Sequence, residues 1–250
     1  MGARVLGVIP ARLQSTRLPR KVIRPLLGIP LIVRVYRAVT ACGLFDRVLV
    51  ATDSHEVVGV CRQFDVAVEL TDEAHRSGTD RVWEVAQRHR AEIIVNVQGD
   101  EPFVTPAHLE QLICPLLRGT AEGVTTLRYR LARDEAIDPN VVKVVCDRYG
   151  RALYFSRSPI PYDREGTAGA VWHKHLGFYA YRLQTLGVFH ALPPGRLEQI
   201  EKLEQLRLLE HGIAIRVLDA PADTLGIDTE EDWRRAEARL AAQARAEHAA

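Results

Sequence analysis

The sequence predicts an α/β fold with three layers, in which helices cover both faces of a mostly parallel central sheet. Two observations support this expectation. Short runs of β-branched residues alternate with segments of helical periodicity in the first part of the chain, which is the pattern of strand–helix–strand units. Residues 124–181 instead hold several strand-like runs joined by short turns, and these runs predict a smaller antiparallel insert.

The expected strands of the parallel part are short apolar runs bounded by polar residues or proline. They lie at residues 5–9, 47–51, 66–70 and 93–97. The last of these runs is the most β-branched, which favours a central position in the sheet. Helices are expected at residues 31–39 and 80–90. Another helix is expected to begin directly after an N-cap at Asp53 or Ser54.

The second part of the chain continues with more strands than helices. Strands are expected at residues 124–131, 141–147, 152–155, 176–181 and 213–218. One long helix is expected at residues 197–210, and Thr229 should cap a final charged helix whose end, residues 241–250, frays. No repeat and no Ser/Gly-rich linker is present, so residues 1–250 are expected to form a single domain that carries the insert.

The composition excludes several classes of protein. The 250 residues have a formal net charge of +1, with 47% hydrophobic and 26% charged residues, which excludes intrinsic disorder. The near-neutral charge argues against a nucleic-acid partner, and no apolar run is long enough to span a bilayer, so no stable membrane association is expected. Four cysteines without a CxxC pair and a first segment without a secretory signal predict a reducing, cytoplasmic location.

Dense positive charge follows the first expected strand. Four cations stand within ten residues, and two hydroxyls lie among them: Arg12, Ser15, Thr16, Arg17, Arg20 and Lys21. Guanidinium groups, hydroxyls and the N–H groups of a turn suit a polyphosphate, although the segment is neither a Walker loop nor a Rossmann fingerprint. The alternative is a solvated basic loop.

Two aspartates are candidates for holding a divalent cation. Asp100 follows the 93–97 strand directly after Gly99, where its carboxylate could bind a metal over a phosphate or could simply end a turn. Asp228 precedes the final helix, where it could be a second metal ligand or an N-cap beside Thr229. The cationic loop after the first strand favours the metal role for Asp100.

Two further segments carry polar side chains. Residues 75–81 form a hydroxyl-rich turn that could contact a base or ribose, or could only cap a helix. His173 and His175 would share one face of a strand, but no third ligand is in register, so a zinc site is not expected. Arg157 and His175 could instead contact an anion, with a hydrogen-bonded structural histidine as the alternative.

Seven segments occur in an order that resembles the 3-deoxy-manno-octulosonate cytidylyltransferase family over residues 4–238. They are IPARLQSTRLPRK, VNVQGDEP, VKVV, ALYFSRSPIP, HLGFYAYR, LEQIEKLEQLR and GIDTEED. The first segment resembles several sugar-activating cytidylyltransferases, whereas YFSRSPIP, HLGFYAYR and LEQIEKLEQLR select this branch. The chain departs from the family pattern at two places. Arg20 replaces a glycine that is common in the family's first loop, and residues 164–173 form a short connection.

The resemblance implies a nucleotide-diphospho-sugar transferase-like fold and Mg²⁺-dependent cytidylyl transfer from CTP to 3-deoxy-D-manno-octulosonate (Kdo), with release of pyrophosphate, for lipopolysaccharide assembly. It implies catalytic roles for Lys21, Asp100 and Asp228, with the two aspartates as metal ligands. The implied nucleotide ligands are Arg12, Ser15, Thr16, Arg17, Lys21, Ser77, Gly78, Thr79 and Gln98. The implied sugar ligands are Arg157, His175, Tyr179, Glu204 and Gln205. It also implies a homodimer formed through the 124–181 insert.

Alternatives remain open at this point. A glycosyltransferase of related architecture would use a nucleotide-sugar donor, and it commonly carries a DxD-like pair where this chain has Gly99-Asp100-Glu101. A non-catalytic module could bind CTP without turnover. Glu204 and Gln205 could be exposed residues of the 197–210 helix, and an 8-amino analogue of Kdo could be the sugar.

Overall fold

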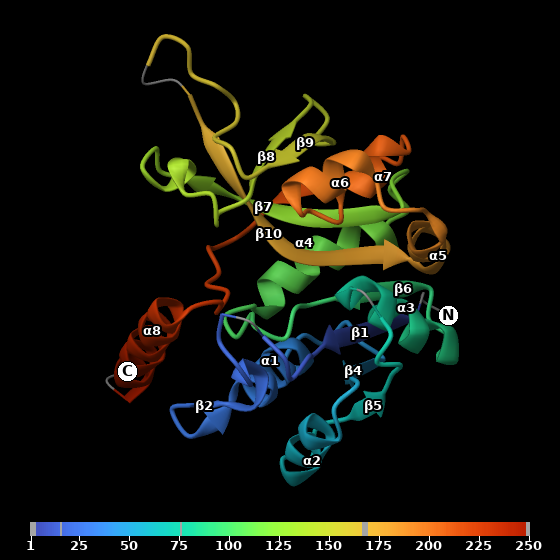
Figure 1. Ribbon diagram of the computed structural model, residues 1–250, viewed down its shortest axis with the longest axis vertical. Helices are drawn as coiled ribbons and strands as arrows, with labels where there is room; N and C mark the ends of the chain where they lie inside the picture. Colours follow the sequence, from blue (N-terminus) through green and yellow to red (C-terminus); the bar gives the residue numbers. More distant parts are fainter. Residues whose placement is uncertain (1–3, 16, 76, 167–169, 249–250) are drawn as a thin grey trace. The chain divides into compact units, whose positions relative to one another are not determined.

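The computed structural model describes residues 4–15, 17–75, 77–166 and 170–248, so Thr16 lies outside the described residues. The chain divides into two compact units, and each is described by itself. Unit 1 comprises residues 1–5, 91–95 and 107–223, and unit 2 comprises residues 6–90, 96–106 and 224–250. The colours of Figure 1 follow the chain through both units.

Unit 2 contains a parallel ladder of three strands. The strands are β1 (Val5–Pro10), β4 (Arg47–Thr52) and β5 (Val68–Leu70), and β4 lies between the other two. Every residue of β1 is buried, as expected for a strand that is covered on both faces. The chain that leaves β6 (Ile93–Asn96) lies beside β1, because the Val97 amide donates to the Val8 carbonyl at 3.2 Å. The segments after β1 and β6 therefore emerge at the same edge of the sheet.

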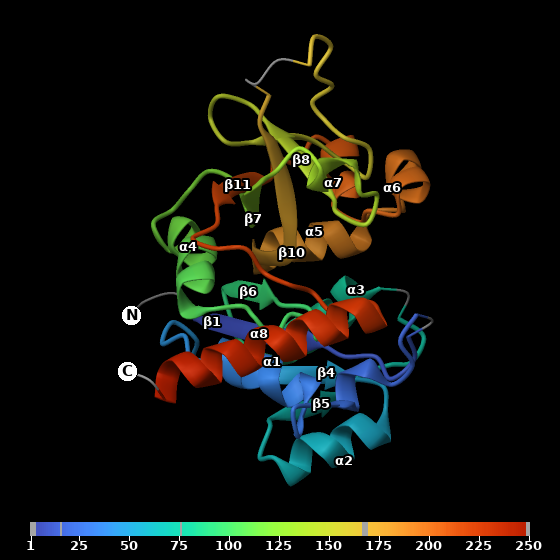
Figure 2. The same cartoon turned by 90° about the vertical axis from the view of Figure 1, so that its left-hand side faces the viewer.

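The helices of unit 2 are the amphipathic segments that the sequence predicts. They are α1 (Leu31–Thr40), α2 (His55–Gln63), α3 (Gly78–Arg88) and α8 (Glu230–His248), preceded by the 3₁₀ turn η1 (Lys21–Ile23) and the β2–β3 hairpin (Pro25–Leu26 and Ile29–Pro30). Ser54 caps α2 through the Val57 amide, and α2 lies beside β5 in both views (Figures 1 and 2). Thr229 caps α8 by accepting from the Asp232 amide at 3.2 Å, which confirms the expected cap.

Two boundaries in unit 2 differ from the expectation. The structure continues α8 to His248, whereas residues 241–250 were expected to fray. The alanine-rich end has high helix propensity, which favours continuation of the helix. The strand β5 begins at Val68 rather than at residue 66, because Val66 instead closes the end of α2 with a hydrogen bond from its amide to the Cys61 carbonyl.

Unit 1 is built on antiparallel pairing around one long strand. In β10 (Trp172–Arg182) most residues pair antiparallel with β7 (Val124–Leu131), and β11 (Arg216–Asp219) adds to the far side of β7 in parallel. The hairpin of β8 (Lys143–Cys146) and β9 (Ala152–Ser156) joins β10 where Lys143 pairs with Lys174. The fold class expected from the sequence, a mostly parallel sheet with a smaller antiparallel part, is confirmed.

The helices of unit 1 differ most from the expectation. The sequence did not predict α4 (Pro106–Leu117) or α5 (Leu183–Ala191). The buried residues of α4 recur at helical spacing along one face, and Pro115 lies near the end of the helix: His108, Leu109, Leu112, Ile113 and Leu116. The described residues contain no helix that is both long and apolar enough to cross a bilayer.

The prediction of a single helix at residues 197–210 is wrong. The structure has two short helices, α6 (Arg196–Glu201) and α7 (Leu206–Glu210), separated at Lys202, which adopts a left-handed conformation with φ 57°. The two helices are joined by the buried pair of Glu198 and Arg207, with Nε 2.8 Å from Oε2. The helix α7 packs against β9, and Glu201 at the end of α6 accepts a hydrogen bond from the Ser156 hydroxyl at the end of β9 (Figure 1). The Glu198–Arg207 pair stabilises the interruption at Lys202, which the apolar periodicity of the segment does not indicate.

Candidate active site

Three side chains from distant parts of unit 2 meet at one ammonium group. Lys21 lies on η1, Asp100 follows β6 and Asp228 precedes α8. The Nζ atom of Lys21 is 2.6 Å from Oδ2 of Asp100 and 2.8 Å from Oδ1 of Asp228, and it also donates to the Ile227 carbonyl at 2.8 Å. The lysine side chain is only 10% exposed. The structure therefore brings together the three residues for which the sequence implied catalytic roles.

The charges of this cluster stabilise one another. Burial alone would lower the pKa of Lys21, but the charge of Asp100 and the hydrogen bonds to both carboxylates outweigh burial, so the pKa is raised. Burial alone would raise the pKa of Asp228, and the hydrogen bond and charge of Lys21, aided by Arg17, lower it instead. The lysine is thus an ammonium and Asp228 a carboxylate at neutral pH.

Backbone contacts hold the segments of this cluster in place. The Ile227 amide donates to the Asp100 carbonyl at 2.9 Å, which ties the segment before α8 to the segment after β6. Gly99 approaches β1 so closely that a Cβ atom there would lie 2.9 Å from the Pro10 carbonyl oxygen. Only glycine fits this contact without a shift of the backbone.

One residue of the cationic loop after β1 has the left-handed backbone conformation that glycine favours. Arg20 adopts φ 60° and ψ 19°, its amide donates to the Leu13 carbonyl at 3.2 Å, and its guanidinium pairs with Glu56. The Leu18 amide donates to the Ser15 hydroxyl at 3.4 Å. The arginine that replaces the family's usual glycine therefore leaves the turn that carries Lys21 intact, at the cost of a strained backbone.

The same loop lines a cavity of about 850 Å³ in unit 2. Its lining residues come from the segments after β1 and β4 and from the turn before α3: Arg12, Leu13, Gln14, Ser15, Pro19, Arg20, Asp53, Ser54, Glu73 and His75. Arg12 donates to the His75 carbonyl at 2.9 Å, and Arg17 pairs with Asp228 at 3.0 Å. The cavity is large enough for a nucleotide, and its cationic side suits phosphate groups.

The other predicted nucleotide ligands lie at the start of α3 and after β6. Ser77 caps α3 and forms a capping box with Asp80, so the helix-capping interpretation holds for this residue. A Cβ atom at Gly78 would lie 3.4 Å from Pro10 and 3.6 Å from Gln98 Oε1, which places these segments side by side. Thr79 is buried, and Gln98 donates to Asn96 at 3.2 Å.

The oxygen atoms around Lys21 are of the type that binds Mg²⁺. Asp100 and Asp228 supply carboxylates and Ile227 supplies a backbone carbonyl, and these are the hard oxygen ligands that Mg²⁺ prefers. Among the described residues, no group of three His, Cys, Asp or Glu side chains could hold a metal by itself. Mg²⁺ is commonly bound by one or two carboxylates together with substrate phosphates and water, so this small set is sufficient.

The predicted sugar ligands lie in unit 1. Arg157 follows β9 and is held by three hydrogen bonds: its amide donates to Glu201 Oε2 at 3.0 Å, Nε to the Glu201 carbonyl at 3.0 Å and Nη1 to the Pro139 carbonyl at 3.1 Å. Glu201 also accepts from the Ser156 hydroxyl at 2.6 Å. The sequence analysis did not single out Glu201, although it lies in the LEQIEKLEQLR segment.

His175 and Tyr179 lie on β10 and are both buried. Burial lowers the pKa of His175 to about 3, so the imidazole is neutral at physiological pH and can form hydrogen bonds but carries no charge. It shares a hydrogen bond of 3.0 Å with Thr126. Glu204 and Gln205 lie in the break between α6 and α7, where Gln205 is 7% exposed, so this glutamine is not the exposed helix residue of the alternative interpretation.

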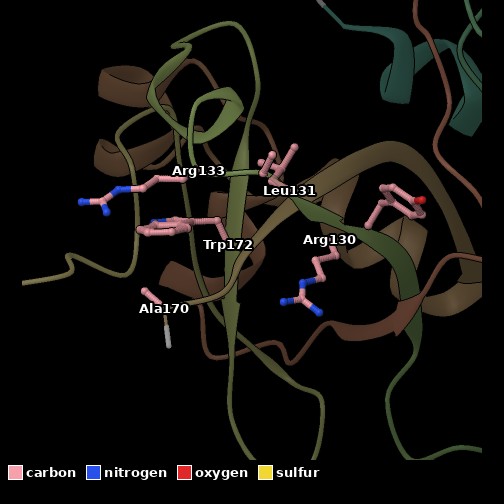
Figure 3. Close-up of a pocket in the computed structure, with 7 residues that line it drawn as sticks. Arg130, Leu131, Arg133, Ala170 and Trp172 are labelled. Carbon is pink, nitrogen blue, oxygen red and sulfur yellow. The ribbon is translucent and has the colours of Figure 1, made fainter. Parts of the chain in front are cut away.

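A second cavity, of about 490 Å³, lies in the antiparallel part of unit 1 and was not predicted. It is lined by Tyr129, Arg130, Leu131, Ala132, Arg133, Ala170 and Trp172. Figure 3 shows Arg133 and Trp172 extending to the same side, whereas Arg130 points elsewhere. Trp172 packs with Leu131 and Ala136 and donates to the Pro161 carbonyl at 3.0 Å.

The chain is similar in sequence to characterised families over most of its length. The family model described as cytidylyltransferase matches residues 6–215. A 3-deoxy-manno-octulosonate cytidylyltransferase from Acidobacterium capsulatum is 54% identical over 94% of this chain and 96% of that relative. The protein of the same name from Koribacter versatilis is 49% identical over 94% of this chain and 89% of that relative.

Solved structures are also similar. A CMP:2-keto-3-deoxy-manno-octonic acid synthetase complexed with CTP superposes with a TM-score of 0.92 at 40% identity, covering 96% of this chain and 100% of that one. A putative glucose-1-phosphate thymidylyltransferase from Bacillus anthracis has a TM-score of 0.66 at 16% identity, covering 94% of both chains, and this similarity concerns the fold alone.

Proposed function

The chain belongs to the 3-deoxy-manno-octulosonate cytidylyltransferase family, and we propose that it transfers a cytidylyl group from CTP to Kdo in a Mg²⁺-dependent reaction. The anomeric hydroxyl of the sugar acid attacks the α-phosphorus of CTP, and pyrophosphate leaves with the electrons of the broken P–O bond. One observation carries the residue assignment, namely the convergence of Asp100, Asp228 and Lys21 within hydrogen-bonding distance.

The residues of unit 2 bind and orient the triphosphate in this proposal. Phosphoryl transfer needs little covalent help from the protein and depends on alignment and on neutralising the charge that develops. Arg12 and Arg17 offer guanidinium groups to phosphate oxygens, and the Ser15 hydroxyl adds a hydrogen-bond donor. Lys21 exchanges part of its contact with the aspartates for a contact with a phosphate oxygen.

Asp100 and Asp228 would hold Mg²⁺ through their carboxylates. When bound, the ion neutralises phosphate charge and lowers the pKa of a coordinated hydroxyl, so no side-chain base is required. Lys21 keeps the two carboxylates close together and reduces their mutual repulsion before substrate arrives.

The residues of unit 1 bind the sugar acid in this proposal. The guanidinium of Arg157 suits the carboxylate, because a charge-assisted pair is stronger and more directional than a neutral hydrogen bond. The neutral imidazole of His175, the Tyr179 hydroxyl and the polar groups of Glu204 and Gln205 suit the sugar hydroxyls. A binding site that is built to hydrogen-bond several hydroxyls rejects analogues that lack them.

The direct test is a steady-state assay of pyrophosphate release with CTP, Mg²⁺ and Kdo. We expect turnover that is saturable in both substrates, with CMP-Kdo as the second product. The release of a nucleoside diphosphate would instead indicate a glycosyltransferase. Tight CTP binding in calorimetry without turnover over any 2-keto sugar acid would indicate a binding module.

A homodimer and a cytoplasmic location complete the proposal. The cavity beside Leu131 and Trp172 places apolar and cationic side chains in the 124–181 insert, and such a surface supports association of two identical copies about a two-fold axis. Sedimentation at micromolar protein should give a species of twice the chain mass. A single species of 28.0 kDa, the mass of one chain, would contradict the dimer.

A further inference from the structure

Lys143 is a fully buried lysine whose ammonium is surrounded by carbonyl groups. It lies at the start of β8, within the VKVV segment, and its exposed fraction is 0%. The Nζ atom donates to the carbonyl of Asp138 at 2.9 Å, of Val141 at 2.6 Å and of Arg157 at 2.5 Å. All three N–H bonds of the ammonium are thus used, and none of these acceptors is a carboxylate. A buried cation satisfied only by backbone carbonyls fixes the course of the chain around it.

The three carbonyls belong to two segments that both position Arg157. Asp138 and Val141 lie in the turn before β8, and Pro139 in the same turn accepts a hydrogen bond from Nη1 of Arg157. The third carbonyl is that of Arg157 itself, which follows β9. One ammonium therefore fixes both the main chain of the arginine and the turn that holds its guanidinium.

Neighbouring contacts fix the same arginine from its other side. Glu201 accepts from the Arg157 amide through its carboxylate and from Nε through its carbonyl. The residue before the lysine, Val142, accepts from the His175 amide at 2.8 Å, so the start of β8 also contacts a second proposed sugar ligand. Among the described residues, Nη2 of Arg157 has no hydrogen-bond acceptor, so this edge of the guanidinium is available to a carboxylate.

The carbonyl cage takes up all three donors of the buried ammonium. Burial lowers the pKa of Lys143, and the nearby charge of Asp138 opposes that shift while the charge of Arg157 adds to it. An apolar side chain of similar length would leave the Val141 and Arg157 carbonyls without the ammonium donor, and they would regain a partner only if the turn or the end of β9 moved. The Asp138 carbonyl would keep its hydrogen bond from the Val141 amide at 3.2 Å.

We infer that Lys143 is a positioning residue for the sugar-acid site, holding Arg157 in the orientation that receives the carboxylate of the substrate. This inference rests on the proposed function, in which Arg157 binds the carboxylate of Kdo. It assigns a role to the VKVV segment, which contacts neither the nucleotide nor the sugar in the proposed mechanism.

The test compares steady-state kinetics of the full-length wild type, Lys143→Met and Lys174→Met. Loss of a well-oriented carboxylate contact weakens binding of one substrate, so Lys143→Met should raise KM for Kdo by about tenfold while kcat and KM for CTP change less than about twofold. Lys174 is the matched control, because it pairs with Lys143 on the neighbouring strand β10 but donates to Asp223. Lys174→Met should keep all three constants near those of the wild type.

A double-substitution comparison separates positioning from general damage. Arg157→Gln should raise KM for Kdo at least as much as Lys143→Met, and the double variant should add little to Arg157→Gln alone, because both act on one contact. KM does not depend on the fraction of active enzyme, so partial misfolding of Lys143→Met leaves the comparison valid. Lys143→Gln keeps two N–H donors and should give an intermediate KM, which provides a second variant with less risk to folding.

Four outcomes would overturn the inference. If both Lys143 variants keep the wild-type KM for Kdo while Arg157→Gln raises it, the positioning role is wrong and the proposed function stands. If the Lys143 variants raise KM for CTP and Kdo equally, or if the double variant shows the product of the single effects, the lysine acts on the structure in general. If wild-type protein does not turn over Kdo, the proposed function fails first, and the inference fails with it.

Discussion

Lys21 and Asp100 form an ion pair with 2.6 Å between Nζ and Oδ2, although 79 residues separate them in the chain. Asp228, from the last part of the sequence, binds the same ammonium at 2.8 Å. In the proposed function, these two carboxylates would hold a divalent ion beside the triphosphate. The electrostatic state of the cluster is therefore set before substrate binds.

Asp100→Asn should abolish turnover and leave the fold intact. The amide keeps the size of the side chain but loses the charge that is needed to hold a divalent cation, so pyrophosphate release should fall by at least about a hundredfold. Calorimetry should still show CTP binding through Arg12 and Arg17, and the circular dichroism spectrum should not change. Asp219→Asn, the same change at an exposed ion pair with Arg128, is the control and should keep activity. Turnover of Asp100→Asn close to the wild-type rate would disprove the metal role.

Gly99→Ala should damage both stability and activity, whereas Gly59→Ala should not. The new methyl at residue 99 would lie 2.9 Å from the Pro10 carbonyl, so the end of β1 or the segment that carries Asp100 must move, at a cost of about 1–3 kcal/mol. Gly59 lies in α2 with no heavy atom near its added Cβ, and alanine there should stabilise the helix by about 0.5–1 kcal/mol. Urea unfolding of both variants measures the contrast, and equal free energies of unfolding would contradict the close-approach argument.

Arg20→Gly should be more stable than Arg20→Ala by about 1 kcal/mol, because residue 20 adopts φ 60° and only glycine populates that region without a steric cost. Both variants lose the exposed ion pair with Glu56, so this loss cancels in the comparison. Thermal or urea unfolding of the two variants gives the difference directly. An alanine variant that equals the glycine variant would show that the backbone of this turn is not strained.

Stability should depend on pH through His175. The pKa of this buried imidazole is about 3 in the folded chain and near 6.5 in the unfolded chain. Between these values the unfolded chain binds a proton that the folded chain does not, so the free energy of unfolding falls as the pH drops below 6.5, by about 1.4 kcal/mol per pH unit. Urea unfolding should therefore show about 2 kcal/mol more loss between pH 7 and pH 5 in the wild type than in His175→Gln. Equal losses in the two proteins would show that His175 is not kept neutral by burial.

The sequence was informative where structure depends on local pattern. The run at residues 124–131 became β7 with the same bounds, and Ser54 and Thr229 cap helices as their side chains predict. Asp100 could be singled out because a polar residue directly after a buried strand lies at the ligand-binding edge of a parallel sheet. Such patterns are decided by residues close together in the chain, so a single sequence contains them.

The remaining features depend on contacts between distant residues. The break at Lys202 is held by Glu198 and Arg207, and the residue periodicity continues through it as though one helix were present. The α4 segment is a different case, because its buried residues do recur at helical spacing, and Pro115, a residue that usually breaks a helix, lies near its end.

The chain by itself determined the class of fold, the caps and the residues that could carry charge near a nucleotide, because spacing and side-chain chemistry are properties of neighbouring residues. Only the tertiary structure decided which charges meet. It joined Asp228 to Lys21 and enclosed Lys143 in carbonyl groups from two separate segments. The physical reason is that the energy of a buried ion depends on the atoms within a few ångströms of it, and folding, rather than sequence separation, brings those atoms together.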